Sequence, residues 1–450
     1  MTTMKTQNPL GYEKESKLLV NFAIPCIISM LVTSLYNIVD QIFIGQGIGM
    51  LGNAATNIAF PLSTTCTALS LLLGIGSATN FSLHLGAGEK EKSARYAGNG
   101  IFLMAVFGLC LFLATTLFLT PMLKFFGATT EVLPYARQYT RITAFGFPFL
   151  IANTGMSKLI LADGSPRYSM ISMLIGAIVN TILDPIFIFG LHLGMTGAAL
   201  ATIISQFVSC IWVLSFLFGK KTIIKIRKEY LLFDKNIMKK ILGLGFTPFF
   251  MSSTEGILQV AFNRQLLLYG GDLSVSAMTI LLSMSQILSL PMEGIAQGAQ
   301  PIISYNFGAK KYDRVKETIK ITIKVALTYS IIGVLLMEAF PQVFVSLFAN
   351  NTQLIQLSYQ LLRIYIFGFI IMGAFSTFQQ TYNALGCGKN AFFFAFFRKI
   401  ILLIPLIYLL PFILPSYGVY AVVLAEPISD LMTTILNGIY FKHFVKKTLA

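Results

Sequence analysis

A single apolar stretch, residues 21–45, constrains the fold of this chain more than any other feature. It reads NFAIPCIISMLVTSLYNIVDQIFIG, and about 20 such residues can cross a bilayer as a helix. Pro25 lies in its first half, and one helical face carries a file of polar residues: Ser29, Thr33, Asn37 and Asp40. A carboxylate inside a spanning helix costs roughly 2.5–3.5 kcal/mol. Asp40 therefore either faces a protein or water cavity, or lies at the headgroups and ends the helix.

The composition is that of a polytopic membrane protein. Of the 450 residues, 55% are hydrophobic and 11% are charged, against about 25% charged in ordinary globular chains. The net charge of +15 would suit nucleic acid, but the Lys and Arg residues lie in short loops between apolar runs, as in cytoplasmic loops. We therefore expect a lipid bilayer around the chain, no nucleic acid and no obligate protein partner.

Cysteine usage and the N-terminus add little. The five cysteines lack the spacing of a metal site or a disulfide framework. We expect no cofactor, and we recognise no cleavable signal peptide, because the first apolar run is too long and has no small-residue cleavage site.

Twelve apolar runs predict twelve transmembrane helices. Lys and Arg concentrate in the loops after the second, sixth and eighth runs and are absent after the first, fifth, ninth and eleventh. This alternation predicts a multi-pass membrane protein with both termini in the cytoplasm. Gly, Pro and charge clusters bound the runs near 18–44, 54–84, 96–119, 135–161, 168–189, 197–218, 240–269, 274–305, 318–340, 357–384, 391–414 and 419–441.

The two halves of the chain repeat. Gly76 matches Gly298 at an offset of 222 residues, and Pro25 matches Pro248 at 223. Six runs per half is an even number, so the repeats are parallel, as in transporters built from two lobes. We predict an all-α fold of two pseudo-symmetric six-helix bundles. The lobes are 1–218 and 241–450, and a basic cytoplasmic linker, 219–240, joins them.

Three runs of the first half carry polar residues that the predicted topology places at one depth, in the outer half of the membrane. Asn180 and Asp184 are four residues apart, hence on one helix face, and Thr202 lies in the next run. Together with Asp40 they offer two carboxylates, an amide and a hydroxyl. This set suits a proton or a small hard cation such as Na⁺. The alternative is a structural hydrogen-bond network within the lobe.

Two prolines are candidates for helix bending. Pro25 lies within the first run, and Pro185 follows Asp184 directly. Pro185 cannot donate to the carbonyl of Thr181, which leaves that oxygen available to a cation or water. Further candidates for a substrate cavity or for coupling are polar residues inside the runs: Tyr36, Asn37, Asn153, Gln206, Glu255, Asn263 and Glu293.

The second half does not copy the candidate cation site. Counted from Pro248, the position that matches Asp40 is Asn263. Glu255 lies inside its run and could be the counter-charge for a cationic substrate. For both Glu255 and Glu293 a functional and a structural role stay open. Two further acids, Glu426 and Asp430, lie four residues apart in the last run. We expect a structural ion pair there, with Arg398 or Lys399 as the partner.

Several motifs resemble the multidrug and toxic compound extrusion (MATE) family over essentially the whole chain. They are PCIISMLVTSLYNIVDQIFIGQ, LADGSPRYSM, LDPIFIFG and PMEGIAQGAQPIISYNFGA, in the first, fourth to fifth, fifth and eighth runs. YNIVDQIFIG resembles the bacterial branch typified by the staphylococcal multidrug efflux pump. This resemblance implies a multi-pass protein of the bacterial cytoplasmic (inner) membrane. Asp40, Asn180, Asp184 and Thr202 are similar to the N-lobe cation site of DinF-like members. The acidic residue that NorM-like members carry in the tenth run is absent here.

The resemblance implies a V-shaped pair of bundles that exports small-molecule organic cations, including antibiotics and other xenobiotics, in exchange for H⁺ or Na⁺. A second hypothesis is a flippase for lipid-linked saccharides or other amphipathic metabolites, which would need a strongly cationic cavity, so Arg363 and Arg398 bear on it. A remote third is an intramembrane enzyme. Because HExxH, GxSxG and paired acidic metal motifs are missing from the sequence, we predict that the chain is not an enzyme.

Overall fold

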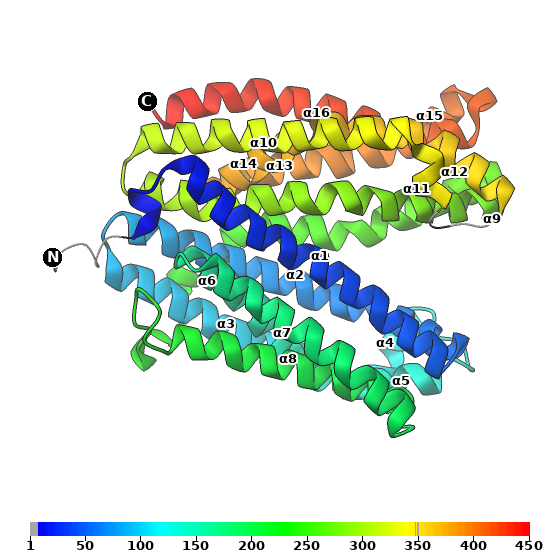
Figure 1. Cartoon of the computed structure of the whole chain (residues 1–450), viewed down its shortest axis with the longest axis horizontal. Helices are drawn as coiled ribbons and strands as arrows, with labels where there is room; N and C mark the ends of the chain where they lie inside the picture. The colour runs from blue at the N-terminus through cyan, green and yellow to red at the C-terminus, as the bar shows by residue number, and fades with distance from the viewer. Residues whose placement is uncertain (1–7, 347, 349–350) are drawn as a thin grey trace. The chain divides into compact units, whose positions relative to one another are not determined.

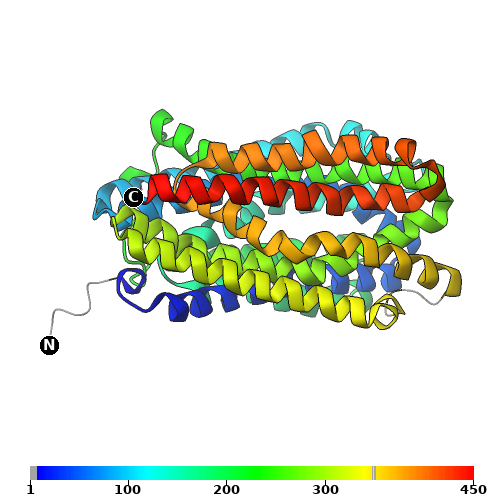
Figure 2. The ribbon, with the colours of Figure 1, turned by 90° about the horizontal axis from the view of Figure 1, so that it is seen from above.

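The computed structural model describes residues 8–346, 348 and 351–450, and every regular element among them is helical. Eleven helices are long and apolar enough to cross a membrane. The predicted all-α polytopic membrane fold is therefore confirmed. Figures 1 and 2 show the long helices running side by side within the bundles.

The first half of the chain forms eight α-helices. They are α1 (Glu15–Gly47), α2 (Met50–Gly86), α3 (Lys90–Leu117), α4 (Leu119–Phe125), α5 (Leu133–Thr143), α6 (Phe147–Ala162), α7 (Pro166–Pro185) and α8 (Met195–Leu217). Single turns η2 (Pro9–Gly11), η3 (Ala144–Gly146) and η5 (Lys228–Tyr230) are 3₁₀-helical, and η4 (Ile186–Gly190) is a π-helix. The fourth predicted span consists of α5, η3 and α6.

The second half forms eight more. They are α9 (Lys235–Gly308), α10 (Tyr312–Ala339), α11 (Pro341–Ser346), α12 (Thr352–Tyr365), α13 (Phe369–Ala384), α14 (Gly388–Phe396), α15 (Ile404–Ile413) and α16 (Val419–Thr448). The 3₁₀ turns η6 (Ile366–Gly368) and η8 (Pro415–Tyr417) and the π-helix η7 (Phe397–Leu403) interrupt this series. The tenth and eleventh predicted spans are therefore each built from two helices around an irregular turn.

Helix α9 contains two of the predicted spans. Its 74 residues are helical except at Gly271, whose φ of 65° and ψ of −165° lie outside the helical region. A residue other than glycine would be strained at this φ, and the chain reverses there, as Figure 1 shows at the label α9. This turn explains why twelve predicted spans fall in eleven long helices.

The predicted linker, 219–240, is irregular or 3₁₀ only as far as Asp234. Helix α9 begins at Lys235, earlier than its apolar run, because the Asp234 carboxylate accepts from the N–H groups of Asn236 and Ile237. This is the N-cap arrangement that satisfies the free donors of a helix start.

The chain divides into two compact units. Among the described residues, unit 1 comprises 8–12 and 28–252, and unit 2 comprises 13–27 and those from 253 to 450. Helices α1 and α9 thus each contribute to both units. The change falls soon after Pro25 in α1 and soon after Pro248 in α9. The division of the sequence into lobes 1–218 and 241–450 stays a prediction.

The repeat-matched glycines allow helices to approach closely. A Cβ at Gly76 of α2 would collide with the backbone of Ile241 in α9, within unit 1. A Cβ at Gly298 of α9 would lie 2.6 Å from the backbone nitrogen of Ala23 in α1, within unit 2. Small residues serve such contacts in membrane helices. Equivalent positions in the two halves therefore make equivalent contacts.

Candidate functional site

Asp40 and Asp184 lie together in unit 1. Asp40 is in the last two turns of α1, and Asp184 is the last residue before Pro185 at the end of α7. Each carboxyl is within hydrogen-bonding reach of the other, and Asp184 is 0% exposed. Two carboxylates cannot donate to one another, so this contact becomes a hydrogen bond only when one of them holds a proton.

Three further side chains surround the pair. Tyr36, one turn before Asp40 on α1, and Tyr139 on α5 are both within electrostatic reach of the two carboxyls. The hydroxyl of Thr202 on α8 donates to the carbonyl of Ala198 at 3.0 Å. The Thr202 side chain also lies next to the Tyr139 hydroxyl. The site thus draws on α1, α5, α7 and α8.

Tyr139 was missed at the sequence level. It lies in the middle of α5, in a polar segment, where a tyrosine looks like an ordinary interfacial residue. Its contact with Thr202 depends on the packing of α5 against α8. The position of Thr202 was predicted from its distance to the helix end. The same comparison of membrane depth is the only sequence signal that could have indicated Tyr139.

Several oxygens of the site lack hydrogen-bond partners. They are Asp40 Oδ1, both Asp184 carboxyl oxygens and Asn180 Oδ1, all buried. Among the described residues, no Lys, Arg or His forms an ion pair with either aspartate. Buried polar atoms are normally satisfied, and an uncompensated buried charge is costly. A proton or a small cation would supply the missing partner.

The donor set consists of hard oxygen ligands. Two carboxylates, the Asn180 amide oxygen and the hydroxyls of Thr202 and Tyr139 suit a proton or Na⁺ rather than a soft transition metal. The described part of the chain contains no cluster of three or more His, Cys, Asp or Glu residues that could hold a metal ion.

An apolar cluster covers the same helix ends. It is built from Ile44, Ala55, Leu123, Ala136, Ile188, Met195 and Ala198, and Tyr139 packs against it. These residues come from the end of α1, the starts of α2, α5 and α8, and from α4 and η4. The aspartate pair therefore lies close in sequence to an apolar core formed by the same ends of α1, α5 and α8.

Other predicted residues of unit 1 lie elsewhere. Asn153 on α6 is buried, and its carbonyl accepts from Ser157 at 2.7 Å. Gln206 on α8 is half-buried beside Gly146, where a Cβ would collide with its amide oxygen. Asn37 is exposed. The interactions described in the structure do not join these three residues to the aspartate pair.

The two prolines predicted to bend helices have different effects on the backbone. Helix α1 continues through Pro25 without a break. Pro185 ends α7, and the π-helix η4 follows it directly. Because Pro185 has no N–H, the carbonyl of Thr181 loses its usual helical donor. The backbone is therefore irregular directly next to Asp184.

In unit 2 the predicted acids join an ionic cluster. The expected ion pair is confirmed: Arg398 contacts Asp430 at 2.6 Å and Glu426 at 3.0 Å. Lys399 pairs with Glu255 at 2.5 Å. Two other candidates take no part in these ion pairs: Asn263 is half-buried and Glu293 is exposed.

A family model matches most of each half of the chain, and known proteins match nearly all of it. The MatE family model matches residues 25–186 and 249–409, once in each half. Multidrug export protein MepA of Staphylococcus haemolyticus is 28% identical over 437 residues, and the one of Staphylococcus aureus (strain NCTC 8325) is 27% identical over 439. Each alignment covers 96% of both chains. A crystal structure of MATE in the bent conformation superposes with a TM-score of 0.93 at 22% identity, covering 100% of this chain and 99% of that one.

Proposed function

The chain belongs to the MatE family of transporters, and from this premise we propose that it is an antiporter. It exports amphipathic, mostly cationic drugs or toxic compounds, and H⁺ or Na⁺ enters in exchange. The curated relatives are named multidrug export proteins. The chain is a transporter and not an enzyme, and its substrates are small molecules.

The observation that carries the proposal is the aspartate pair. Asp40 and Asp184 contact each other without a basic partner among the described residues, and three of their four carboxyl oxygens are buried without a hydrogen bond. A purely structural network would satisfy its acceptors. The negative charge of the pair is instead not compensated, and a coupling cation would provide the missing positive charge.

Occupation of the pair would change the packing of α1. A proton or Na⁺ removes the repulsion between the carboxylates, so that α1 and α7 can approach more closely. Helix α1 contributes to unit 2 up to Ile27 and to unit 1 from Ile28. A change near Asp40 therefore acts on a helix that both units share. Coupling follows if cation and drug prefer different conformations of the transporter.

The flippase hypothesis loses support from the arginines. Arg363 is paired with Glu338 at 3.0 Å, and Arg398 is paired with both Glu426 and Asp430. Neither guanidinium is left uncompensated to hold a pyrophosphate group. The drug-export hypothesis does not need such a site.

The test is efflux of an organic cation dye from proteoliposomes under H⁺ and Na⁺ gradients imposed separately. We expect one gradient to drive efflux in the wild type. Asp40→Asn and Asp184→Asn should each lower gradient-driven efflux at least about tenfold, since an amide cannot take up a proton or balance Na⁺. Asp272→Asn is the matched control, because Asp272 is exposed beside the turn of α9.

Each outcome decides a point. Loss of efflux in both variants assigns coupling to unit 1, and the effective gradient identifies the ion. Efflux that persists in both variants overturns the role of the aspartate pair. If neither gradient moves any cationic dye in the wild type, the drug-export function itself falls, and lipid-linked substrates become the next test.

A further inference from the structure

Asn99 of α3 holds both ends of a short loop that precedes α9. Its side chain donates to the carbonyl of Tyr230 at 3.4 Å and accepts from the N–H of Asp234 at 2.9 Å. A Cβ at Gly98 would lie 2.3 Å from the same Tyr230 oxygen, so the glycine allows the loop to approach α3 closely. This clamped loop, residues 230–234, therefore has a defined position on unit 1.

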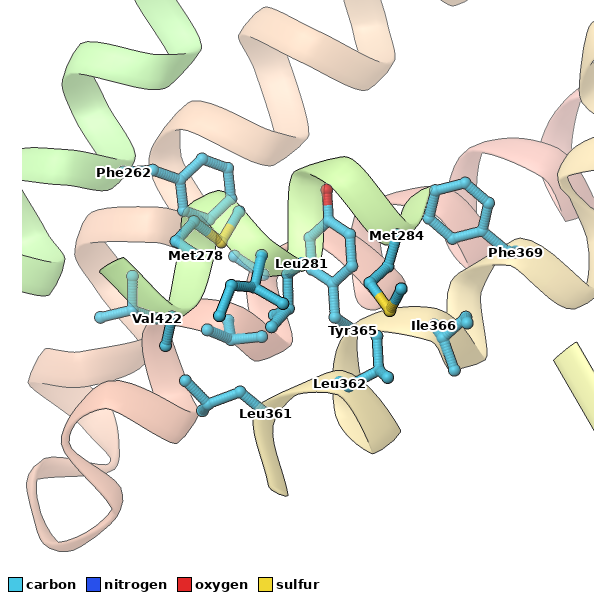
Figure 3. Close-up of a cluster of buried hydrophobic side chains, with 14 of the residues drawn as sticks. Phe262, Met278, Leu281, Met284, Leu361, Leu362, Tyr365, Ile366, Phe369 and Val422 are labelled. Atoms are coloured by element: carbon cyan, nitrogen blue, oxygen red, sulfur yellow. The ribbon is translucent and has the colours of Figure 1, made fainter. Parts of the chain in front are cut away.

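The tip of the clamped loop is apolar and exposed. Leu232 is 67% exposed and Phe233 is 57% exposed. Large apolar side chains in the core of unit 2, such as Leu281 and Tyr365, are by contrast covered by their neighbours, as Figure 3 shows. Two adjacent uncovered apolar side chains on a loop that is fixed at its base indicate a contact surface.

The clamped loop lies at the depth where α3 enters the bilayer. The first turns of α3 carry charged residues up to Arg95, and the apolar run of this span begins at residue 96. Asn99 lies about one turn further along the helix. Because the loop is bonded to Asn99, it lies at the layer between headgroups and acyl chains. The predicted topology places this layer on the cytoplasmic side.

Exposed basic residues flank the tip on both sides, in the segment before the loop and in the first turns of α9. They are Lys225, Arg227, Lys228, Lys235, Lys239 and Lys240. Only two acids lie between the first and the last of them. Glu229 pairs with Arg227 at 3.2 Å, and the Asp234 carboxylate caps α9. The apolar tip therefore lies within a positively charged surface.

Charge complementarity selects an anionic lipid surface as the occupant. A second copy of this chain would bring the same positive charge to the contact and would be repelled. A cytoplasmic leaflet instead combines negative headgroups with apolar chains at the depth of the loop.

We propose that residues 225–240 form a docking surface for anionic phospholipids of the cytoplasmic leaflet. Leu232 and Phe233 insert between the acyl chains, and the flanking Lys and Arg side chains bind the headgroups. Asn99 fixes the depth of the tip. This surface goes beyond the proposed export function and does not depend on it.

The test is quenching of tryptophan fluorescence by lipid in proteoliposomes that have the same lipids in both leaflets. Trp212 is the single tryptophan of the chain, so Trp212→Phe/Phe233→Trp carries its only indole at the tip. Phosphatidylglycerol or phosphatidylcholine, each brominated on its acyl chains, replaces unbrominated phosphatidylcholine in steps. We expect both to quench, with a preference for phosphatidylglycerol of at least about fivefold, the contribution of about one basic residue near an anionic surface.

Neutral variants in the same background separate headgroup binding from exposure to the bilayer. Lys225→Gln/Arg227→Gln/Lys228→Gln should remove the preference for phosphatidylglycerol and keep quenching by both lipids, because the tip stays apolar. Lys316→Gln/Lys320→Gln, which changes two exposed lysines of α10, is the matched control and should keep the preference. Added salt should lower the preference of the unneutralised protein, because it screens charges at the surface.

Two outcomes would overturn the proposal. An indole that neither lipid quenches would lie in water or against protein, such as a second copy of the chain. Equal quenching by the two lipids, unchanged by neutralisation, would mean exposure to the bilayer without headgroup binding. Leu232→Trp in place of Phe233→Trp repeats the measurement at the neighbouring position, so the result does not depend on one substitution. No gradient and no drug are used, so failure of the export function is distinguishable from failure of this proposal.

Discussion

Asp163 lies in the turn between α6 and α7 and accepts hydrogen bonds from the basic segment that follows α8, residues 219–234. Both of its carboxylate oxygens accept from the N–H of Ile223 at 3.1 Å, and Oδ1 also accepts from the Thr222 hydroxyl at 3.2 Å. Burial raises the pKa of Asp163 to about 7, although hydrogen bonds from Ile223, Thr222 and Ile224 act in the opposite direction. The ordinary pKa of this carboxyl is 3.8.

The sign of the pH effect follows from this difference in pKa. Between about pH 4 and pH 7 the folded protein holds a proton on Asp163 that the unfolded chain has lost. The free energy of unfolding therefore falls as pH rises through this window, by at most about 1.4 kcal/mol per pH unit. We expect Asp163→Asn to lose this dependence, because the amide does not titrate.

The measurement is the apparent melting temperature of the detergent-purified protein between pH 4 and pH 8. The melting temperature of Asp163→Asn, taken relative to the wild type, should rise with pH across this range. Asp272→Asn, which changes an exposed acid, should run parallel to the wild type. A constant difference between Asp163→Asn and the wild type would contradict the assignment.

Some residues of the candidate site could be predicted from the sequence and others could not. Asp40 and Asp184 are conspicuous because acids are rare in apolar runs, and counting from the helix ends placed them at one depth. Tyr139 is not conspicuous, because a tyrosine in a polar segment is common. Nothing in the sequence indicates that it lies next to Thr202. The exposure of Glu255 beside a buried Lys399 also depends on packing, which no spacing in the sequence reveals.

At the scale of single elements, irregular turns decide which partners meet. The sequence predicted that Arg398 or Lys399 would neutralise Glu426 and Asp430. In the structure Arg398 contacts both acids, and Lys399 reaches Glu255 of α9 instead. The π-helix η7 spans Phe397–Leu403, and its wider turn changes the direction of successive side chains. Apolar periodicity predicts the helix here but not the π turn.

Helix α9 offers a matched test of close packing between helices. A Cβ at Gly245 would collide with the backbone of Leu72 in α2, whereas a Cβ at Gly243 meets nothing within 4 Å. Backbone atoms cannot move aside as a flexible side chain can. We therefore expect Gly245→Ala to destabilise the protein by about 1–3 kcal/mol.

Gly243→Ala is the control for Gly245→Ala on the same helix. It should be neutral or stabilise the protein by up to about 1 kcal/mol, because alanine favours a helix more than glycine does. The measurement compares the apparent melting temperatures of both variants with that of the wild type. Equal effects of the two substitutions would mean that α2 and α9 do not pack closely at Gly245.

At the scale of the whole molecule, two helices are shared between the unit of the aspartate pair and the unit of the ionic cluster. Helix α1 carries Asp40 in unit 1 and begins in unit 2, and α9 carries Glu255 in unit 2 and begins in unit 1. Each helix changes unit shortly after a proline, where the helix lacks one backbone hydrogen bond. The halves have diverged in chemistry: unit 1 leaves a carboxylate pair without a cation, whereas unit 2 provides Lys399 as an internal one.

This division of roles predicts reciprocal coupling between cation and drug. If each prefers a different conformation, each must weaken the binding of the other by the same factor. For a proton-coupled transporter, the apparent Kd of tetraphenylphosphonium should rise about tenfold between pH 8 and pH 5.5, within the range of measured coupling factors. Drug binding at an intermediate pH should release protons into a weakly buffered solution. With Na⁺ as the coupling ion, added Na⁺ should raise the Kd at constant pH.

The variants assign the coupling to its site. Asp184→Asn should bind the drug with an affinity that no longer depends on pH or Na⁺, and drug binding should release no protons. Asp272→Asn, which changes an exposed acid away from the aspartate pair, should keep the dependence. A wild-type Kd that is the same in every condition, together with gradient-driven efflux, would contradict coupling through opposed preferences. The cation and the drug would then influence each other only during the transport step.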